Sequence, residues 1–123
     1  MKMLSKLLIA TAISSLVATS GLANEDLVKK GEKVFTEKKI GNCVACHAIT
    51  GSSKVMDMGP GSFGPDLSTA AYYPKEMLVS LIYDIYSVDG KPKNTAMPAY
   101  GKGGLLDENE IDAVVAYIQS FAK

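Results

Sequence analysis

The stretch Cys43-Val44-Ala45-Cys46-His47 decides how this chain folds, because it combines the only two cysteines with the only histidine. The C-x-x-C-H pattern is the attachment signature of covalent c-type haem. Two thiols three positions apart on one turn can each add to a vinyl group of the haem, and the next imidazole then lies under the iron. The motif predicts one haem c, attached through Cys43 and Cys46, with His47 as an iron ligand.

Three other uses of a C-x-x-C pair compete with this interpretation: a structural disulfide, a thiol–disulfide redox centre and a zinc site. Zinc needs more ligands of the usual kind than two cysteines and one histidine provide. A thioredoxin-like centre expects a βαβ context, and no segment of this chain alternates like a strand. The adjacent His47 and an export signal favour haem.

The N-terminus has the pattern of that export signal. A short basic segment precedes an apolar run from Leu7 to Val17, and Gly21-Leu22-Ala23 provides small residues at a peptidase site. The apolar run is too short to span a bilayer, which counts against a membrane anchor. We predict cleavage of the signal peptide 1–23 after Ala23, leaving residues 24–123 as one cytochrome c domain in the periplasm.

The charge balance of that domain excludes one class of partner. Removing Lys2 and Lys6 leaves eleven lysines against thirteen acidic residues, and the chain has no arginine. It therefore lacks the strongly basic footprint of a nucleic-acid binder. A domain of this size buries a modest core and usually depends on a disulfide, a metal or a cofactor.

Three segments have helical periodicity, so the predicted fold is all-α, with three main helices and long loops around one covalent haem. The first helix covers roughly Glu25–Lys38, the second opens with Pro74 and stops near Asp89, and the third follows Asp107, where Glu110 completes a capping-box spacing. The expected apolar stripes are Leu27, Gly31, Val34 and Phe35; Met77, Leu78, Leu81, Ile82 and Ile85; and Ile111, Val114, Val115, Ile118 and Phe121.

The connections Gly41–Ala71 and Gly90–Gly104 are long and rich in glycine, proline and serine. Long loops without regular structure are unusual in a compact domain unless a functional group organises them. A haem buried between the helices would organise both.

The second axial ligand of the iron cannot be another histidine of this chain, because His47 is the only one. Methionine, lysine and an open site remain. Met77 lies on an apolar helix stripe, where packing in the core accounts for it. Met56 and Met58 follow His47 by too few residues to reach the opposite face of the haem.

Met97 lies in the loop between the second and third predicted helices. Pro98 pushes the backbone at Met97 toward extended geometry, which lets the thioether project across the haem. We predict Met97 as the distal ligand; the alternative is a loop methionine that only covers the haem edge. Ligation by histidine and methionine fills the iron, which then passes electrons without binding a substrate.

These features resemble class I cytochromes c across residues 24–123. Gly31 and Phe35 are similar to the family's glycine–aromatic pair on the first helix, which packs against the last helix. The resemblance places that contact near Val114, Tyr117 and Ile118.

The element Gly64-Pro65-Asp66-Leu67 resembles the Gly-Pro-x-Leu element of the same class. A metal-bound histidine usually donates its second ring N–H to a fixed acceptor. The resemblance implies that the Pro65 carbonyl is this acceptor for His47 and that Leu67 lines the haem. The alternative is a surface turn without contact to the haem.

A narrower resemblance is to the SoxX family, the monohaem subunits of SoxAX cytochromes in bacterial sulfur oxidation. The segment Gly41–Ile49 is similar to the haem site of that family. Further stretches match its pattern in order: Gly61–Leu67, Leu81–Asp84, Ala96–Gly101 and Leu105–Ile111. Ala99 stands where the family often has proline, a departure that leaves Met97 unchanged.

The SoxX resemblance implies a set of partners. A SoxA-like cytochrome, which carries the reactive cysteine, would form a heterodimer with this chain. The pair is similar to an L-cysteine S-thiosulfotransferase, which oxidatively joins thiosulfate to a cysteine of a SoxYZ-like carrier. This chain would have no catalytic residues of its own and would relay electrons to a downstream cytochrome. The alternatives are a free-standing soluble class I shuttle and a sensor haem with an open distal site.

Lysines gather around the Met97 loop. Lys91, Lys93 and Lys102 lie there, and no acidic residue occurs between Gly90 and Leu106. A positive rim beside an exposed haem edge would steer an acidic partner. An ordinary solvated loop is the alternative.

Overall fold

The computed structural model describes the backbone of residues 14–123 and the side chains from Asn24 onward. The described part of the chain contains helices and no strand, which confirms the all-α class. None of the helices in this part is long and apolar enough to cross a membrane. The predicted signal peptide, residues 1–23, begins outside the described residues, and no side chain of it is described, so it stays a prediction.

Four α-helices alternate with three single helical turns along the described part of the chain. They are α1 Ser14–Thr36, η1 Cys43–Ala45, α2 Ser53–Asp57, η2 Ala70–Tyr72, α3 Lys75–Tyr83, η3 Ile85–Ser87 and α4 Glu108–Gln119, where η marks a single turn of 3-10 helix.

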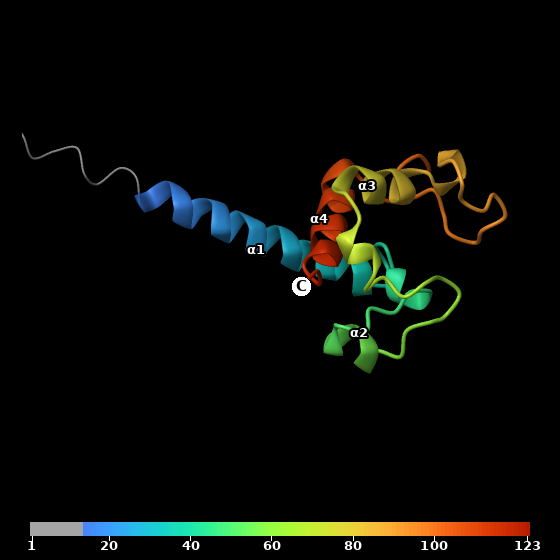
Figure 1. Cartoon of the computed structure of the whole chain (residues 1–123), viewed down its shortest axis with the longest axis horizontal. Helices are drawn as coiled ribbons and strands as arrows, with labels where there is room; N and C mark the ends of the chain where they lie inside the picture. The colour runs from blue at the N-terminus through green and yellow to red at the C-terminus, as the bar shows by residue number, and fades with distance from the viewer. Residues whose placement is uncertain (1–13) are drawn as a thin grey trace, which may run out of the picture.

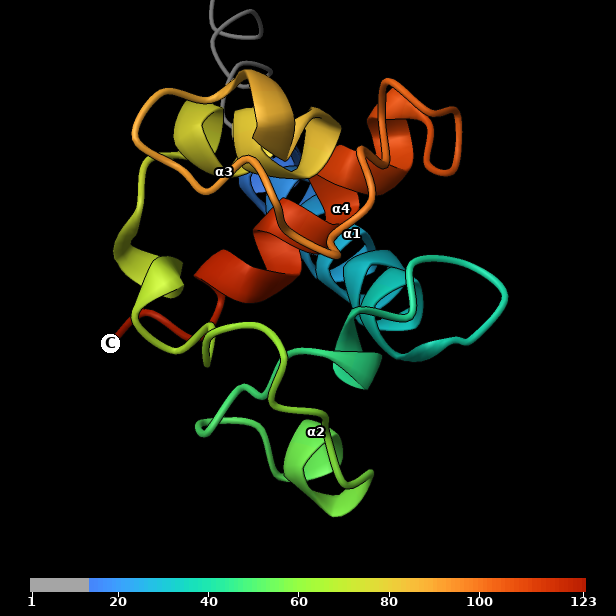
Figure 2. The ribbon, with the colours of Figure 1, turned by 90° about the vertical axis from the view of Figure 1, so that its right-hand side faces the viewer.

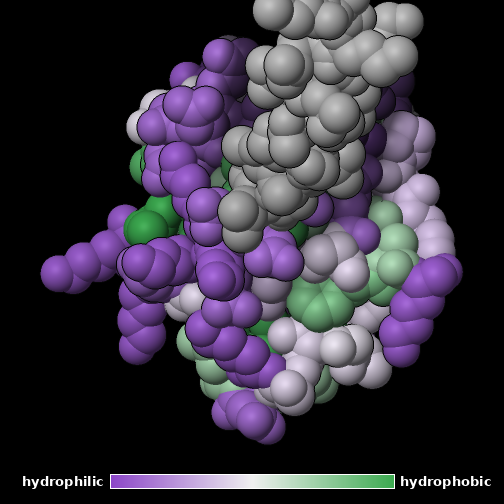
Figure 3. All heavy atoms as spheres, turned by 90° about the vertical axis from the view of Figure 1, so that its left-hand side faces the viewer, coloured by the Kyte–Doolittle hydropathy of each residue, from purple (hydrophilic) through white to green (hydrophobic). Residues whose placement is uncertain are grey.

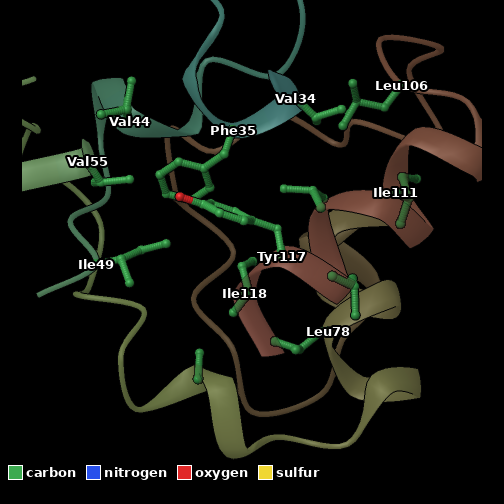
Figure 4. Packing of buried hydrophobic residues seen from close by; sticks show 13 residues of the cluster. Val34, Phe35, Val44, Ile49, Val55, Leu78, Leu106, Ile111, Tyr117 and Ile118 are labelled. Carbon is green, nitrogen blue, oxygen red and sulfur yellow. The ribbon is translucent and has the colours of Figure 1, made fainter. Parts of the chain in front are cut away.

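The crossing of α1 and α4 forms the centre of the molecule (Figure 1). Gly31 lies at this crossing, since a β-carbon there would overlap the carbonyl of Ala113 and the β-carbon of Tyr117. Phe35 packs its ring against that of Tyr117, with 5.7 Å between the ring centroids. Figure 4 shows the two rings in the middle of the buried cluster. The predicted contact of Gly31 and Phe35 with the last helix is confirmed.

Two of the fully buried core side chains belong to the connection that follows the haem motif. They are Ile49 and Val55, which join Val34, Phe35, Val114 and Val115 from α1 and α4. Full burial of such a side chain contributes about 1.5–3 kcal/mol. The connection is therefore attached to the helical core just before α2, through Ile49, and within α2, through Val55.

Helix α4 begins as its sequence predicts. The Asp107 carboxylate accepts a hydrogen bond from the Glu110 N–H at 2.8 Å, and the Glu110 carboxylate accepts one from the Asp107 N–H at 3.0 Å. Both bonds of the capping box satisfy backbone donors that the first helical turn leaves free.

Helix α1 differs from its predicted bounds. It begins at Ser14 and continues through Ala23, the expected cleavage point, instead of starting at Glu25. Alanine and leucine are frequent between these positions, and both favour helix. The helix ends at Thr36, where the Gly41 N–H bonds back to the Val34 carbonyl at 3.0 Å and turns the chain toward the haem motif.

Helix α3 is shorter than predicted. Pro74 is its N-cap, not its first residue, and the helix ends at Tyr83 instead of near Asp89. The Asp84 backbone is extended, and its carboxylate accepts a hydrogen bond from the Tyr86 N–H at 3.1 Å, which starts η3. Aspartate often ends a helix in this way, because its side chain competes for backbone N–H groups.

The stripe of α3 that faces the core consists of Leu78, Val79 and Ile82. Met77 was expected to pack in the core, but its side chain is 44% exposed. Residues 77 and 78 are about 100° apart around a helix, so burying Leu78 turns Met77 toward solvent. The expectation for Met77 is wrong in this respect.

Two loop regions project from the same side of the helical centre (Figures 1 and 2). One is the 43–67 segment, which contains η1 and α2, and the other is the 88–104 loop, which follows η3. The predicted unstructured connection 41–71 therefore includes regular turns. Figure 3 shows the opposite face, where hydrophilic side chains cover most of the visible surface outside the grey region.

Candidate haem site

The C-x-x-C-H motif forms one tight turn, η1. The N–H groups of Cys46 and His47 both donate to the Cys43 carbonyl, at 3.1 and 2.9 Å. Asn42 precedes the turn in the left-handed region, with φ 50°, a conformation that asparagine tolerates. No disulfide joins the two cysteines, and burial raises the pKa of the Cys43 thiol to about 12.

The His47 ring is oriented by a hydrogen bond of 2.8 Å between its Nδ1 and the Pro65 carbonyl. A carbonyl can only accept, so Nδ1 carries the proton and Nε2 keeps its lone pair for a metal. Gly64 lies against the ring, because a β-carbon at this position would overlap it. The contact implied by the Gly-Pro-x-Leu element is therefore present in the structure.

Backbone hydrogen bonds hold this element beside the haem motif. The Gly64 N–H donates to the Cys46 carbonyl, and the Leu67 N–H donates to the Ala48 carbonyl, both at 2.9 Å. The side chain of Leu67 is half-buried and packs against the hydrophobic core. The pairing fixes the position of Pro65 from both sides.

Met97, half-buried in the 88–104 loop, is held by a tyrosine that sequence analysis did not identify. The Tyr86 hydroxyl contacts the carbonyls of Thr95 and Met97, at 2.8 and 3.1 Å. The Met97 N–H donates to the Thr95 side chain at 3.2 Å. Nothing in the sequence around Tyr86 indicates that its hydroxyl reaches a loop nine residues away.

Tyr100 connects the Met97 loop to the haem motif. Its hydroxyl donates to the Gly41 carbonyl at 2.8 Å, and its N–H donates to the Ile82 carbonyl at 3.1 Å. Burial raises the pKa of Tyr100 to about 12. Sequence analysis included Tyr100 in a matching stretch but assigned it no role.

Two of the three lysines around the Met97 loop have partners within the chain. Lys93 donates to the carbonyls of Tyr86 and Val88, at 2.6 and 3.1 Å. Lys102 forms an ion pair of 3.6 Å with Asp84, whose side chain is only 8% exposed. The absence of acidic residues within the loop did not reveal the ion pair of Lys102, because its acidic partner Asp84 follows α3 and lies outside the loop.

The donor set fits a covalently attached haem. The two thiols share one turn. The imidazole of His47 lies between this turn and the Gly-Pro-x-Leu element, and its Nε2 is free to bind iron. Tyr100 brings the loop that contains the thioether of Met97 next to the same turn. Fold and site together define a helical haem protein of the c type.

The comparison with protein families agrees with this class. The sequence model described as Cytochrome c matches residues 28–122. This chain belongs to the cytochrome c family, with the all-α class I fold and covalently bound haem c. It is an electron-transfer haem protein. No curated protein matches the chain closely enough to count as a relative.

Proposed function

We propose that this chain is the monohaem, electron-accepting subunit of a SoxAX-type complex in the periplasm. Cys43 and Cys46 would hold the haem covalently, and His47 and Met97 would bind its iron. The haem supplies an iron that takes up and releases one electron. The observation that supports a relay is that both proposed ligands belong to segments fixed by hydrogen bonds to backbone carbonyls.

The proposed ligands act through their hydrogen-bond partners. The Pro65 carbonyl fixes the tautomer and orientation of His47 and increases the basicity of Nε2. A methionine ligand raises the reduction potential relative to harder ligands. The Tyr86 and Tyr100 hydroxyls hold the Met97 loop without depending on the charge of the iron. Because no ligand needs to leave, electron transfer requires little movement of the chain.

The sulfur chemistry belongs to the proposed partners. Joining thiosulfate to a carrier thiol forms a sulfur–sulfur bond and releases two electrons and one proton. Both cysteines of this chain belong to the haem motif, so it has no thiol to offer. We assign the reactive cysteine to a SoxA-like cytochrome and the acceptor thiol to a SoxYZ-like carrier. This chain would hold the one haem that takes up these electrons singly, for transfer to a downstream cytochrome.

Replacing Met97 tests the ligand assignment. Met97→Ala should open the sixth coordination position, lower the reduction potential and let the reduced iron bind carbon monoxide, while haem attachment survives. The weak red absorption band of an iron–thioether bond should disappear. Met77→Ala is the matched control, because Met77 is exposed on α3 and should leave the band unchanged. Loss of the band in the Met77 variant, or its survival in the Met97 variant, would contradict the assignment.

Reconstitution tests the role. The isolated protein should exchange electrons rapidly with small redox partners and should not oxidise thiosulfate. Adding a SoxA-like cytochrome and a SoxYZ-like carrier should produce thiosulfate-dependent reduction of this haem. Oxidation of thiosulfate by the isolated chain would refute the relay. A haem that stays oxidised in the complete mixture would refute the SoxX assignment and leave a free-standing shuttle.

A further inference from the structure

Asp66 directly follows the residue that accepts the hydrogen bond from His47. The carbonyl oxygen of Pro65 and the nitrogen of Asp66 belong to one planar peptide unit. Whatever fixes Asp66 therefore also fixes the direction of the acceptor. Proline has no N–H, so Pro65 itself adds no backbone donor that could hold the segment in place.

The Asp66 carboxylate is the centre of a network with Thr50 and Ser68. One carboxylate oxygen accepts from the Thr50 hydroxyl, and the other accepts from the Ser68 N–H at 2.9 Å and the Ser68 hydroxyl at 2.7 Å. The Thr50 N–H completes the network, at 2.9 Å from the Ser68 hydroxyl and 3.3 Å from the carboxylate. Hydrogen bonds to a charged acceptor are stronger than neutral ones.

The network joins the two chain segments that meet at His47. Thr50 lies three residues after His47, and Asp66 and Ser68 lie just after Pro65. The bonds from Thr50 and Ser68 favour the ionised carboxyl and hold the pKa of Asp66 well below its usual range. The backbone bonds of Gly64 and Leu67 flank the same peptide, so the segment has supports besides Asp66.

We propose that Asp66 is a positioning residue for the haem ligand His47, acting through the Pro65 carbonyl. The proposal rests on the assignment of His47 as an iron ligand. A firmly placed carbonyl strengthens the bond from Nδ1 and gives the ring more anionic character, which favours the oxidised iron. A displaced carbonyl weakens that bond, so the reduction potential rises.

Three variants separate position from charge. Asp66→Ala removes both the network and a negative charge. The double variant Thr50→Val with Ser68→Ala keeps the charge. Of the contacts within the Asp66 network that join the two segments, it leaves only the 3.3 Å contact between the Thr50 N–H and Asp66. Asp57→Ala removes a charge from α2 and leaves the network intact. All three are made in the full haem-containing protein.

The readouts are exchange of the His47 Nδ1 proton with solvent, followed by NMR in the oxidised protein, and the reduction potential. Loss of about 1.4 kcal/mol of hydrogen-bond free energy corresponds to about tenfold faster exchange. We expect this acceleration and a higher potential in Asp66→Ala and in the double variant. Asp57→Ala should have wild-type exchange.

Unchanged exchange in Asp66→Ala would overturn the proposal. A higher potential in Asp66→Ala without any change in the double variant would also overturn it, because charge alone would then account for the effect. Failure of the ligand assignment is distinguishable from both outcomes. If His47 is not a ligand, its ring protons lack the large paramagnetic shifts of an iron-bound imidazole already in the wild type.

Discussion

Replacing Tyr100 by phenylalanine tests whether its hydroxyl connects the Met97 loop to the haem motif. The substitution removes the 2.8 Å hydrogen bond to the Gly41 carbonyl and leaves the ring in place. Gly41 is buried, and among the described residues its carbonyl accepts no other hydrogen bond. A buried acceptor without a partner costs about 1–3 kcal/mol.

Thermal unfolding of the oxidised protein measures this cost. For a domain of about 100 residues, each kcal/mol lowers the melting temperature by about 4–8 °C, so Tyr100→Phe should lower it by at least that amount. The iron–thioether band should weaken at a lower temperature than in the wild type, because the loop containing Met97 loses its support. Tyr72→Phe is the matched control: Tyr72 is 62% exposed, and its hydroxyl contacts only the terminal Lys123. Its effect should stay within about 0.5 kcal/mol.

The pH dependence tests the burial of the same hydroxyl. Burial raises the pKa of Tyr100 to about 12 in the folded protein, whereas tyrosine ionises near pH 10 in an unfolded chain. The contribution of Tyr100 to stability is therefore complete below pH ~10 and is lost as the pH rises toward 12. The wild type and Tyr100→Phe should converge in this interval. Equal stability of the two proteins at neutral pH would refute the role given to the hydroxyl.

Three further predictions follow from other contacts. Gly31→Ala should destabilise the folded protein by about 1–3 kcal/mol through overlap with α4, although alanine is normally the better helix residue. Gly51→Ala is its control, because the nearest atom to a β-carbon at that position is 3.6 Å away. Lys102→Glu should lower the melting temperature by placing a second carboxylate near Asp84, whereas Lys91→Glu should change only the ionic-strength dependence of electron transfer to an acidic partner. Asp66→Asn should flatten the loss of stability below pH ~4, because the wild-type carboxyl has a lowered pKa and stabilises the fold only while ionised. Denaturant titrations at several pH values measure the last effect.

Local signals predicted much of the fold. The capping box of α4 is encoded within four residues, and the contact of Gly31 with the last helix follows from a known family pattern. The apolar periodicity predicts a helix that continues past Tyr83, because Ile85 extends the stripe, and it gives no sign of the break at Asp84. Its extended backbone depends on the bonds that its carboxylate makes to η3 and Lys102. The spacing of apolar residues does not indicate that a carboxylate will compete for backbone N–H groups in this way.

Local signals also predicted the C-x-x-C-H turn and, through the resemblance, the acceptor for His47. They did not indicate the roles of Tyr86, Tyr100 or Asp66. The Tyr100 hydroxyl meets its partner across fifty-nine positions of sequence, and the partner is a carbonyl, which every residue carries. A hydrogen bond to the backbone leaves no complementary residue type to recognise. Such contacts become visible only when the chain is folded.

The two loop regions are held by different chemistry, and this difference bears on how an electron-transfer site can be adjusted. An ionised carboxylate organises the peptide beside His47, whereas neutral tyrosine hydroxyls organise the loop of Met97. Carboxylate bonds depend on charge, so substitutions around Asp66 can change the field at the iron as well as the position of its ligand. The tyrosine bonds carry no net charge, and changes there affect mainly how firmly the loop is held. If the proposed ligand assignment holds, substitutions beside Pro65 should therefore change chiefly the reduction potential, and substitutions at Tyr100 should change chiefly the stability of the Met97 loop.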